Sequence, residues 1–314
     1  MNGPPFVIAH RGASGYLPEH TREAKVLAYG QGADFLEQDV VATSDGRLVV
    51  LHDVCLDEVT DVALRFPRRR RSDGRFYVVD FTFDELRTLR IVERRQPGSQ
   101  QRVFPGRFGD DDVEFRIVAF EDELRLIRAL NAATGRVVGV YPEIKSPAFH
   151  REHGIDLAAQ VLEMLARYGY SGPEDAAVVQ CFDPGELQRC RHELGARLRL
   201  AQLTEEESGA EVDFDALARY AEIWAPHYSA LLDTAGSDVD IRVAEAAREA
   251  RRAGLELHPY TFRADEVPTY FADVAQQLEF FYEQVGVDAV FCDHPDVAVH
   301  ARESSAGRPI ERPA

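Results

Sequence analysis

The sequence predicts an α/β fold, a (β/α)8 TIM barrel with a small subdomain inserted after the second strand. Short β-type runs alternate with helical patterns along the chain, the order expected of parallel βαβ units. Eight such runs occur, the number that closes a barrel. No Gly-x-Gly-x-x-Gly turn follows the first run, which disfavours the competing doubly wound sheet. We therefore treat residues 1–314 as a single barrel domain.

The composition is that of an ordinary folded protein. Hydrophobic residues make up 45% of the 314, and 36 Lys+Arg against 54 Asp+Glu give a net charge of −18. This balance argues against intrinsic disorder and against nucleic acid as the main partner. No apolar run reaches the roughly 18 residues of a membrane-spanning helix. An anionic substrate would need a local positive centre to overcome the overall charge.

The expected elements follow one another regularly. The eight strands cover residues 6–10, 34–41, 137–145, 176–182, 197–203, 222–228, 255–262 and 288–295. Helical patterns cover residues 20–32, 121–131, 154–169, 183–194, 215–222, 239–254 and 273–286. Gly32 is typical of a helix C-cap, and Asp183-Pro184 of a helix start. The polar segment 301–314 is expected to be a frayed tail.

One connection is far longer than the others. Between the second and third strands, residues 48–53 resemble a strand that returns after the turn Ser44-Asp45-Gly46. Residues 54–116 are rich in loops and have little periodicity, so we expect an insertion subdomain there, on the top face of the barrel. The basic run 68–71 within it is most simply a solvated loop.

Acidic side chains gather at the expected carboxyl ends of the strands, where barrels of this kind keep their functional residues. Glu37 and Asp39 lie two apart on one strand and face the same side, as do Glu143 and Lys145 on the next. Three carboxylates converging inside a barrel require compensation. Either one Mg²⁺ or Ca²⁺ is bound by Glu37, Asp39 and Glu143, or the acids form structural ion pairs with Arg and Lys.

Two histidines follow neighbouring strands. His10 ends the first strand, and His52 ends the strand that returns after the acids. A histidine alone is more often structural, but two beside a metal suit general acid and general base roles. Arg11 offers a planar fork for phosphate oxygens. The spacing does not fix the reaction.

Taken together, these segments resemble the glycerophosphodiester phosphodiesterases over nearly the whole chain. The order HRG, ExD, HD and PEIK makes the resemblance specific, and it is closest to the larger bacterial periplasmic type, which carries a similar insertion. The matching segments are AHRGASGYLPEHT (9–21), GADFLEQDVVATSDGRLVVLHD (32–53), YPEIKSP (141–147), QCF (180–182), HPYT (258–261) and FCDHP (291–295).

The resemblance implies metal-dependent hydrolysis of glycerophosphodiesters, such as glycerophosphocholine and glycerophosphoethanolamine, to sn-glycerol 3-phosphate and an alcohol. By position, His10 and His52 match the acid/base pair of the family. Glu37, Asp39 and Glu143 match the ligands of one divalent cation, Ca²⁺ or Mg²⁺.

Further positions match the substrate site of the family. Arg11 and Lys145 match residues that hold the phosphate. The other substrate-binding candidates are Glu19, Gln180, Phe182 and Tyr260. Many members have Glu-Asn-Thr where this chain has Glu19-His20-Thr21, and Trp where it has Tyr260. Tyr260 keeps an aromatic wall, so the departure bears on substrate preference.

Two alternatives are less well supported. A phospholipase C-like or sphingomyelinase D-like enzyme on the same barrel would need apolar, membrane-facing loops, and the loops here are polar. A non-catalytic barrel that binds phosphodiesters would be expected to lack a histidine or a metal acid.

The cellular compartment is an open expectation. The first residues, MNGPPFVIAH, contain no basic region and no apolar signal segment, which as written predicts the cytoplasm. The resemblance instead suggests a periplasmic or secreted protein from which a leader has been removed. The four cysteines are expected to be free thiols, because they are too few for a disulfide scaffold.

Overall fold

The structure is a computed structural model, and it describes residues 3–109, 113–205, 212–233 and 241–305. Within these residues, a parallel sheet curls into the predicted barrel in the order β12-β9-β8-β7-β6-β2-β1-β13. Its strands are β1 (Phe6–Ala9), β2 (Phe35–Ala42), β6 (Gly139–Ile144), β7 (Val178–Cys181), β8 (Arg199–Thr204), β9 (Ile223–Pro226), β12 (Glu256–Leu257) and β13 (Ala289–Cys292). Each lies inside or within one residue of an expected strand, and the predicted fold class is confirmed.

The barrel closes between β12 and β13 through isolated contacts rather than a continuous ladder. The strand expected over residues 255–262 ends at Leu257. Pro259 follows it, and proline has no amide hydrogen for a ladder bond. Beyond it, Phe262 pairs with Cys292 of β13 in a single parallel bridge. The barrel is therefore nearly closed, with its weakest seam beside β13.

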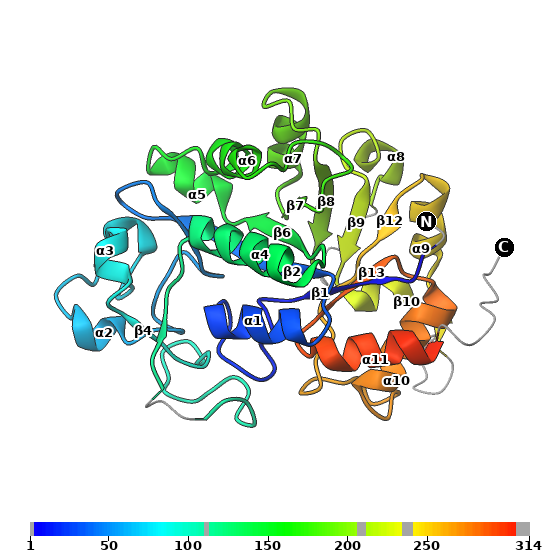
Figure 1. Ribbon diagram of the computed structural model, residues 1–314, viewed down its shortest axis with the longest axis horizontal. Helices are drawn as coiled ribbons and strands as arrows, with labels where there is room; N and C mark the ends of the chain where they lie inside the picture. The colour runs from blue at the N-terminus through cyan, green and yellow to red at the C-terminus, as the bar shows by residue number, and fades with distance from the viewer. Residues whose placement is uncertain (1–2, 110–112, 206–211, 234–240, 306–314) are drawn as a thin grey trace.

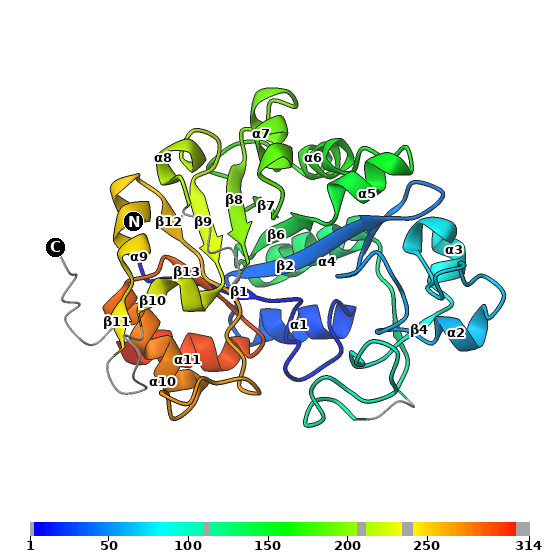
Figure 2. The same cartoon turned by 180° about the vertical axis from the view of Figure 1, so that it is seen from behind.

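Helices cover the outside of the sheet, as Figures 1 and 2 show from opposite sides. They are α1 (Arg22–Gly30), α4 (Phe120–Thr134), α5 (Pro147–Glu152), α6 (Leu157–Arg167), α7 (Pro184–His192), α8 (Phe214–Leu217), α9 (Glu245–Arg252), α10 (Val274–Phe280) and α11 (Pro295–Ser305). The predicted caps are confirmed. Gly32 adopts a φ of 96° just beyond α1, and the Asp183 side chain accepts hydrogen bonds from the amides of Gly185 and Glu186.

Two predicted boundaries are wrong. Residues 301–305 belong to α11, whose small residues Ala298 and Ala301 are buried, so the tail does not fray there. Residues 306–314 lie outside the described part. The helix expected over 239–254 begins only at Glu245, because Arg242–Val243 form strand β11 against β10 (Leu232–Asp233). Short turns complete the described fold at Tyr228–Leu231 and Phe281–Val285.

The segment after β2 begins as predicted. Strand β3 (Leu48–Val50) returns antiparallel to β2 after a turn in which Gly46 has a φ of 75°. Beyond it lie α2 (Val62–Arg65), a turn at Val78–Asp80, α3 (Phe83–Leu86), β4 (Arg90–Ile91) and β5 (Phe115–Arg116). Figure 1 shows this inserted segment, in cyan and teal, at the end of the molecule opposite the N-terminus.

The inserted segment has an apolar cluster of its own. Buried side chains from it, including Phe76, Phe81 and Leu86, pack on Val41 and Val49 of the barrel hairpin. A second cluster, with Tyr141 and Phe291, fills the inside of the barrel. The inside of the barrel is thus filled by side chains. The end of the barrel at which the strands finish faces the inserted segment.

Candidate active site and metal centre

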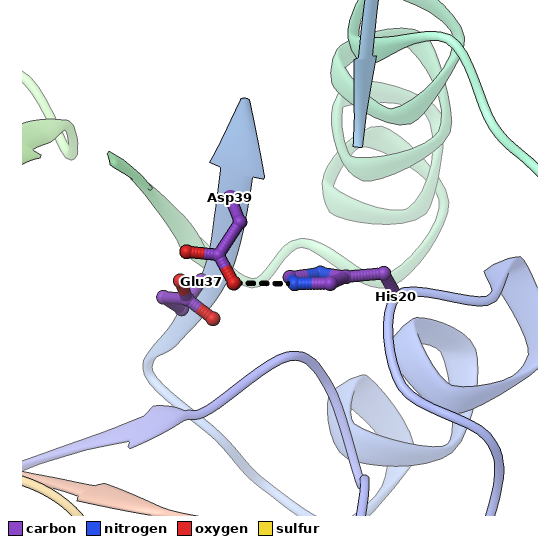
Figure 3. Close-up of side chains that lie close together, drawn as sticks. All are labelled: His20, Glu37 and Asp39. Carbon is purple, nitrogen blue, oxygen red and sulfur yellow. Dashed lines mark hydrogen bonds and ion pairs between the residues drawn. The ribbon is translucent and has the colours of Figure 1, made fainter. Parts of the chain in front are cut away.

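Three buried carboxylates lie side by side on β2 and β6. Glu37 and Asp39 are both on β2, and Asp39 pairs in register with Glu143 of β6. Glu143 in turn pairs with Gln180 of β7. Because paired residues of parallel strands point to the same side of a sheet, this register brings the carboxylates together. Figure 3 shows Glu37 and Asp39 projecting from one strand.

Burial and neighbouring charges shift the pKa values of these three acids. Burial, together with the neighbouring Asp39 carboxylate, raises the pKa of Glu37 well above its usual range. Burial also raises the pKa of Glu143 to about 8, although Lys145 opposes the shift. Burial opposes ionisation of Asp39 as well, but Lys145, His52 and His20 outweigh it and hold its pKa well below normal. The protein's own cations therefore compensate only part of the negative charge.

His20 belongs to this cluster, and the sequence did not reveal it as a candidate. Its Nε2 lies 2.7 Å from Oδ2 of Asp39, and its Nδ1 is buried without a hydrogen-bond partner (Figure 3). One ligand atom each from His20, Glu37 and Asp39 lie within 4.8 Å of one another. The residue adopts a φ of 60°, which folds the loop before α1 back toward β2. Only its place next to Glu19 in the family-like segment could have drawn attention to it.

His10 is a largely buried imidazole with a fixed orientation. Its Nδ1 lies 2.6 Å from Oδ1 of Asp293, and its Nε2 accepts a 3.2 Å hydrogen bond from Nε of Arg11. Since Nε2 accepts, Nδ1 carries the proton and donates to Asp293. Burial and the adjacent Arg11 lower the pKa of His10 to about 3. The ring is therefore uncharged at neutral pH, with its Nε2 lone pair engaged by Arg11.

His52 is the more accessible histidine, with 30% of its side chain exposed. Its Nδ1 lies 2.7 Å from Oδ1 of Asp53. Burial, followed by the charges of Arg11 and Lys145, lowers the pKa of His52 to about 4. Each histidine thus has one ring nitrogen held by an aspartate, which orients the other.

Arg11 and Lys145 place positive charge among these groups. The backbone amide of Arg11 donates to Oε2 of Glu37 at 2.6 Å, and its guanidinium donates to Glu19 at 3.0 Å. Nζ of Lys145 lies 2.9 Å from Oε1 of Glu143 and 3.8 Å from Oδ1 of Asp39. Both cations are therefore at the site, paired with its carboxylates.

Three further arginines reach the site, and the sequence gave no sign of them. Arg94, in the inserted segment, bridges Glu19 and Asp53, with 2.6 Å contacts to each. Arg107, also in the inserted segment, contacts Oδ2 of Asp293 at 2.6 Å. Arg263 contacts the same oxygen at 3.1 Å. Because the partners of all three are distant in sequence, and because the segment that carries Arg94 and Arg107 lacks periodicity, no local pattern could identify them.

Most of the predicted site residues line one cavity of about 90 Å³. Those that line it are His10, Arg11, Glu37, Asp39, His52, Glu143, Gln180, Phe182 and Tyr260. Lys145 stands at its edge, with Nζ 5.8 Å from the centre of the Phe182 ring. Glu19 instead lines an adjoining cavity. The amide of Gln180 points toward Glu37, and its Oε1 is buried without a hydrogen-bond partner.

The chain is similar to known proteins over most of its length. Residues 10–297 match the Glycerophosphoryl diester phosphodiesterase family. A Glycerophosphodiester phosphodiesterase of Haemophilus influenzae is 41% identical, over 95% of this chain and 90% of its own. One of Treponema pallidum is 36% identical, over 94% and 90%.

Solved structures share the fold. A putative glycerophosphoryl diester phosphodiesterase from Silicibacter pomeroyi superposes with a TM-score of 0.72 at 23% identity, covering 98% of this chain and 95% of its own. An Oleispira antarctica phosphodiesterase, in complex with the product sn-glycerol-3-phosphate, gives 0.66 at 20% identity, covering 96% and 97%. Among the described helices, none is both long and apolar enough to cross a membrane.

Proposed function

Because the chain belongs to the glycerophosphoryl diester phosphodiesterase family, we propose that it hydrolyses glycerophosphodiesters to sn-glycerol 3-phosphate and an alcohol, with His10 and His52 as the general acid/base pair. The observation that carries this proposal is the pairing of two neutral histidines across one cavity. Each is anchored by an aspartate at Nδ1, and Arg11 lines the same cavity as the carboxylates.

The two histidines divide the proton transfers. In hydrolysis of a phosphodiester, one group removes a proton from the nucleophile and another protonates the departing alkoxide. Both rings are uncharged at neutral pH, so the ring that acts as base takes the proton of the nucleophile, and the ring that acts as acid must first take a proton from solvent before it can give one to the alkoxide. Asp293 and Asp53 then stabilise the imidazolium that forms, as a carboxylate hydrogen-bonded to Nδ1 does in other acid/base sites.

We propose that Glu37, Asp39 and Glu143 hold one divalent cation, and the residues present fit such an ion. The raised pKa values of Glu37 and Glu143 indicate uncompensated negative charge, and an oxygen-rich set suits Ca²⁺ or Mg²⁺. His20 adds one imidazole nitrogen beside this set. When bound, a divalent cation supplies charge stabilisation for phosphoryl oxygens.

Arg11 and Lys145 are proposed to hold the phosphate. Nε of Arg11 lies 3.5 Å from Asp39, and Nζ of Lys145 lies 2.9 Å from Glu143. The cation would also engage these two acids, so the hydrogen-bond donors of both side chains can turn to substrate oxygens once the acids are compensated. The planar Arg11 fork suits two phosphate oxygens, and Lys145 provides a point charge. Electrostatic stabilisation of the transition state then adds to positioning.

The test is release of sn-glycerol 3-phosphate from glycerophosphocholine and glycerophosphoethanolamine, with and without a chelator. We expect release from both diesters, loss of activity in EDTA, and recovery with Ca²⁺ or Mg²⁺. Intact phosphatidylcholine serves as the comparison substrate, and its preferred cleavage would favour a phospholipase instead. Full activity after exhaustive chelation would refute the metal proposal.

A further inference from the structure

A second cavity, of about 260 Å³, adjoins the first one. The two cavities share His10, Arg11, His52 and Arg263 in their linings. A phosphodiester has two ester arms. If the phosphate is placed at the shared residues, as the proposed function requires, each arm has a cavity of its own. The inference below rests on that function.

The two cavities differ in chemistry. Away from the shared residues and the carboxylate cluster, the first is walled by apolar and aromatic side chains, among them Phe182, Leu203 and Phe291. The second is walled largely by charged side chains from the inserted segment and the loops after the last strands. An uncharged glycerol unit suits the first cavity, whereas a charged arm suits the second.

One acid in the second cavity has no ion-pair partner within the described part of the chain. Glu19 pairs with Arg94 at 2.6 Å, Asp293 with Arg107 at 2.6 Å, and Glu266 with Arg263 at 3.1 Å. Glu93, two residues beyond β4, has no ion pair within 4 Å to any described residue, and its Oε1 is buried without a hydrogen-bond partner. The residue is only 7% exposed.

A buried carboxylate without a partner is costly and is expected to be compensated. Burial raises the pKa of Glu93 to about 7, and the nearby Arg107 offsets only part of that effect. A cationic ligand group in the cavity would supply the missing charge. It would also stabilise the ionised carboxylate in a place with little competing water.

We propose that the second cavity receives the leaving alcohol of the substrate and that Glu93 recognises a cationic ammonium group on it. Glu93 is thereby a specificity-determining residue that favours diesters of amino alcohols, such as ethanolamine and choline. Because Glu93 and part of the cavity wall come from the inserted segment, the insertion contributes to head-group preference.

The experiment compares kcat/KM for glycerophosphoethanolamine and glycerophosphoglycerol in the wild type and in Glu93→Gln. Removing one member of a desolvated charge pair is expected to lower kcat/KM for the ethanolamine diester by at least about 10-fold. The value for the glycerol diester, whose alcohol is uncharged, is expected to stay near that of the wild type. Glu114→Gln is the matched control, since it removes an exposed carboxylate of the inserted segment that pairs only with Arg116 among the described residues.

Other outcomes overturn the inference. An equal loss for both diesters would mean that the common glycerol unit contacts Glu93, and no change for either would mean that Glu93 does not contact the substrate. A second measurement is independent of turnover: choline chloride is titrated against wild type and Glu93→Gln by calorimetry, with dimethylbutanol as its uncharged isostere. We expect choline to bind the wild type more tightly than the isostere and to lose this advantage in the variant; an unchanged advantage refutes the inference. If the wild type cleaves neither diester, the proposed function fails, and the binding measurement still decides the role of Glu93.

Discussion

His10 and His52 have similar hydrogen bonds but differ in their access to solvent. The His10 side chain is 12% exposed and is fixed at both ring nitrogens, by Asp293 and by Arg11. His52 is fixed at one nitrogen only and is 30% exposed. His52 therefore has the freer nitrogen for exchange of a proton with solvent after each turnover.

Replacement of either histidine by alanine is expected to lower kcat by about 10²–10⁴, the usual contribution of an acid/base group. KM is expected to change less, because the phosphate contacts of Arg11 and Lys145 remain. The assay is release of sn-glycerol 3-phosphate under saturating substrate. His192→Ala, an exposed histidine at the end of α7, is the control. Near-normal turnover in His10→Ala or His52→Ala would remove that residue from the mechanism.

Glu93 is also expected to make the stability of the folded protein depend on pH. Its pKa is near 7 in the folded protein and about 4.5 when unperturbed, so the folded state holds its proton to higher pH. Stability is thus lost as the pH rises from about 5 through 7, and the loss approaches about 3 kcal/mol. Glutamine at this position cannot ionise and avoids the loss.

We therefore expect Glu93→Gln to be more stable than the wild type at pH 8, with a smaller difference at pH 5. Urea unfolding at the two pH values measures this. A stability difference that is independent of pH would show that Glu93 does not titrate in this range.

At the scale of elements, several helix ends lie where simple capping rules place them. Helix α7 is an example, because Asp183 caps it and Pro184 fits its first turn. Asp183→Ala is expected to lower the free energy of unfolding by about 1 kcal/mol, since two amides lose their acceptor.

Thermal unfolding of Asp183→Ala measures the contribution of this cap to stability. Asp84→Ala is the control, because Asp84 is 82% exposed and provides no cap at α3, where Thr82 does so. A melting temperature of Asp183→Ala equal to that of the control would contradict the capping role.

The sequence was sufficient for the barrel strands and for most residues of the candidate site, because in parallel strands these residues follow local patterns of alternation and strand endings. Glu37, Asp39 and Glu143 were found in this way. Arg94, Arg107 and Glu93 were not, since the inserted segment has no periodicity and its contacts span long distances in sequence. His20 was missed because its significance lies in a left-handed turn that sequence patterns rarely indicate.

At the scale of the whole molecule, Arg94 joins the inserted segment to the barrel. Its guanidinium contacts Glu19 from the loop before α1 and Asp53 from the loop after β3. The same two acids contact Arg11 and His52, so the inserted segment helps to position the site. Among the described residues, loss of Arg94 would leave Asp53 with only its hydrogen bond to His52 and Glu19 with only its pair to Arg11.

Arg94→Ala is accordingly expected to lower the free energy of unfolding by about 3 kcal/mol. It is also expected to speed proteolytic cleavage of the inserted segment. Urea unfolding and limited proteolysis are the measurements. Arg87→Ala, which removes an arginine that is 62% exposed in the same segment, is the control. Equal stability and equal cleavage rates in the two variants would show that Arg94 is no anchor.

The contact between His10 and Asp293 can form only late in synthesis of the chain. The two residues are 283 positions apart, and β1 pairs with β13 along its whole length. At about 5–20 residues per second, the ribosome completes the intervening chain in roughly 15–60 s. Throughout that period the first strand has one edge without its neighbour, and His10 has no aspartate to fix its ring. Activity can therefore begin only after the last strand has emerged, and an incomplete chain is an inactive one.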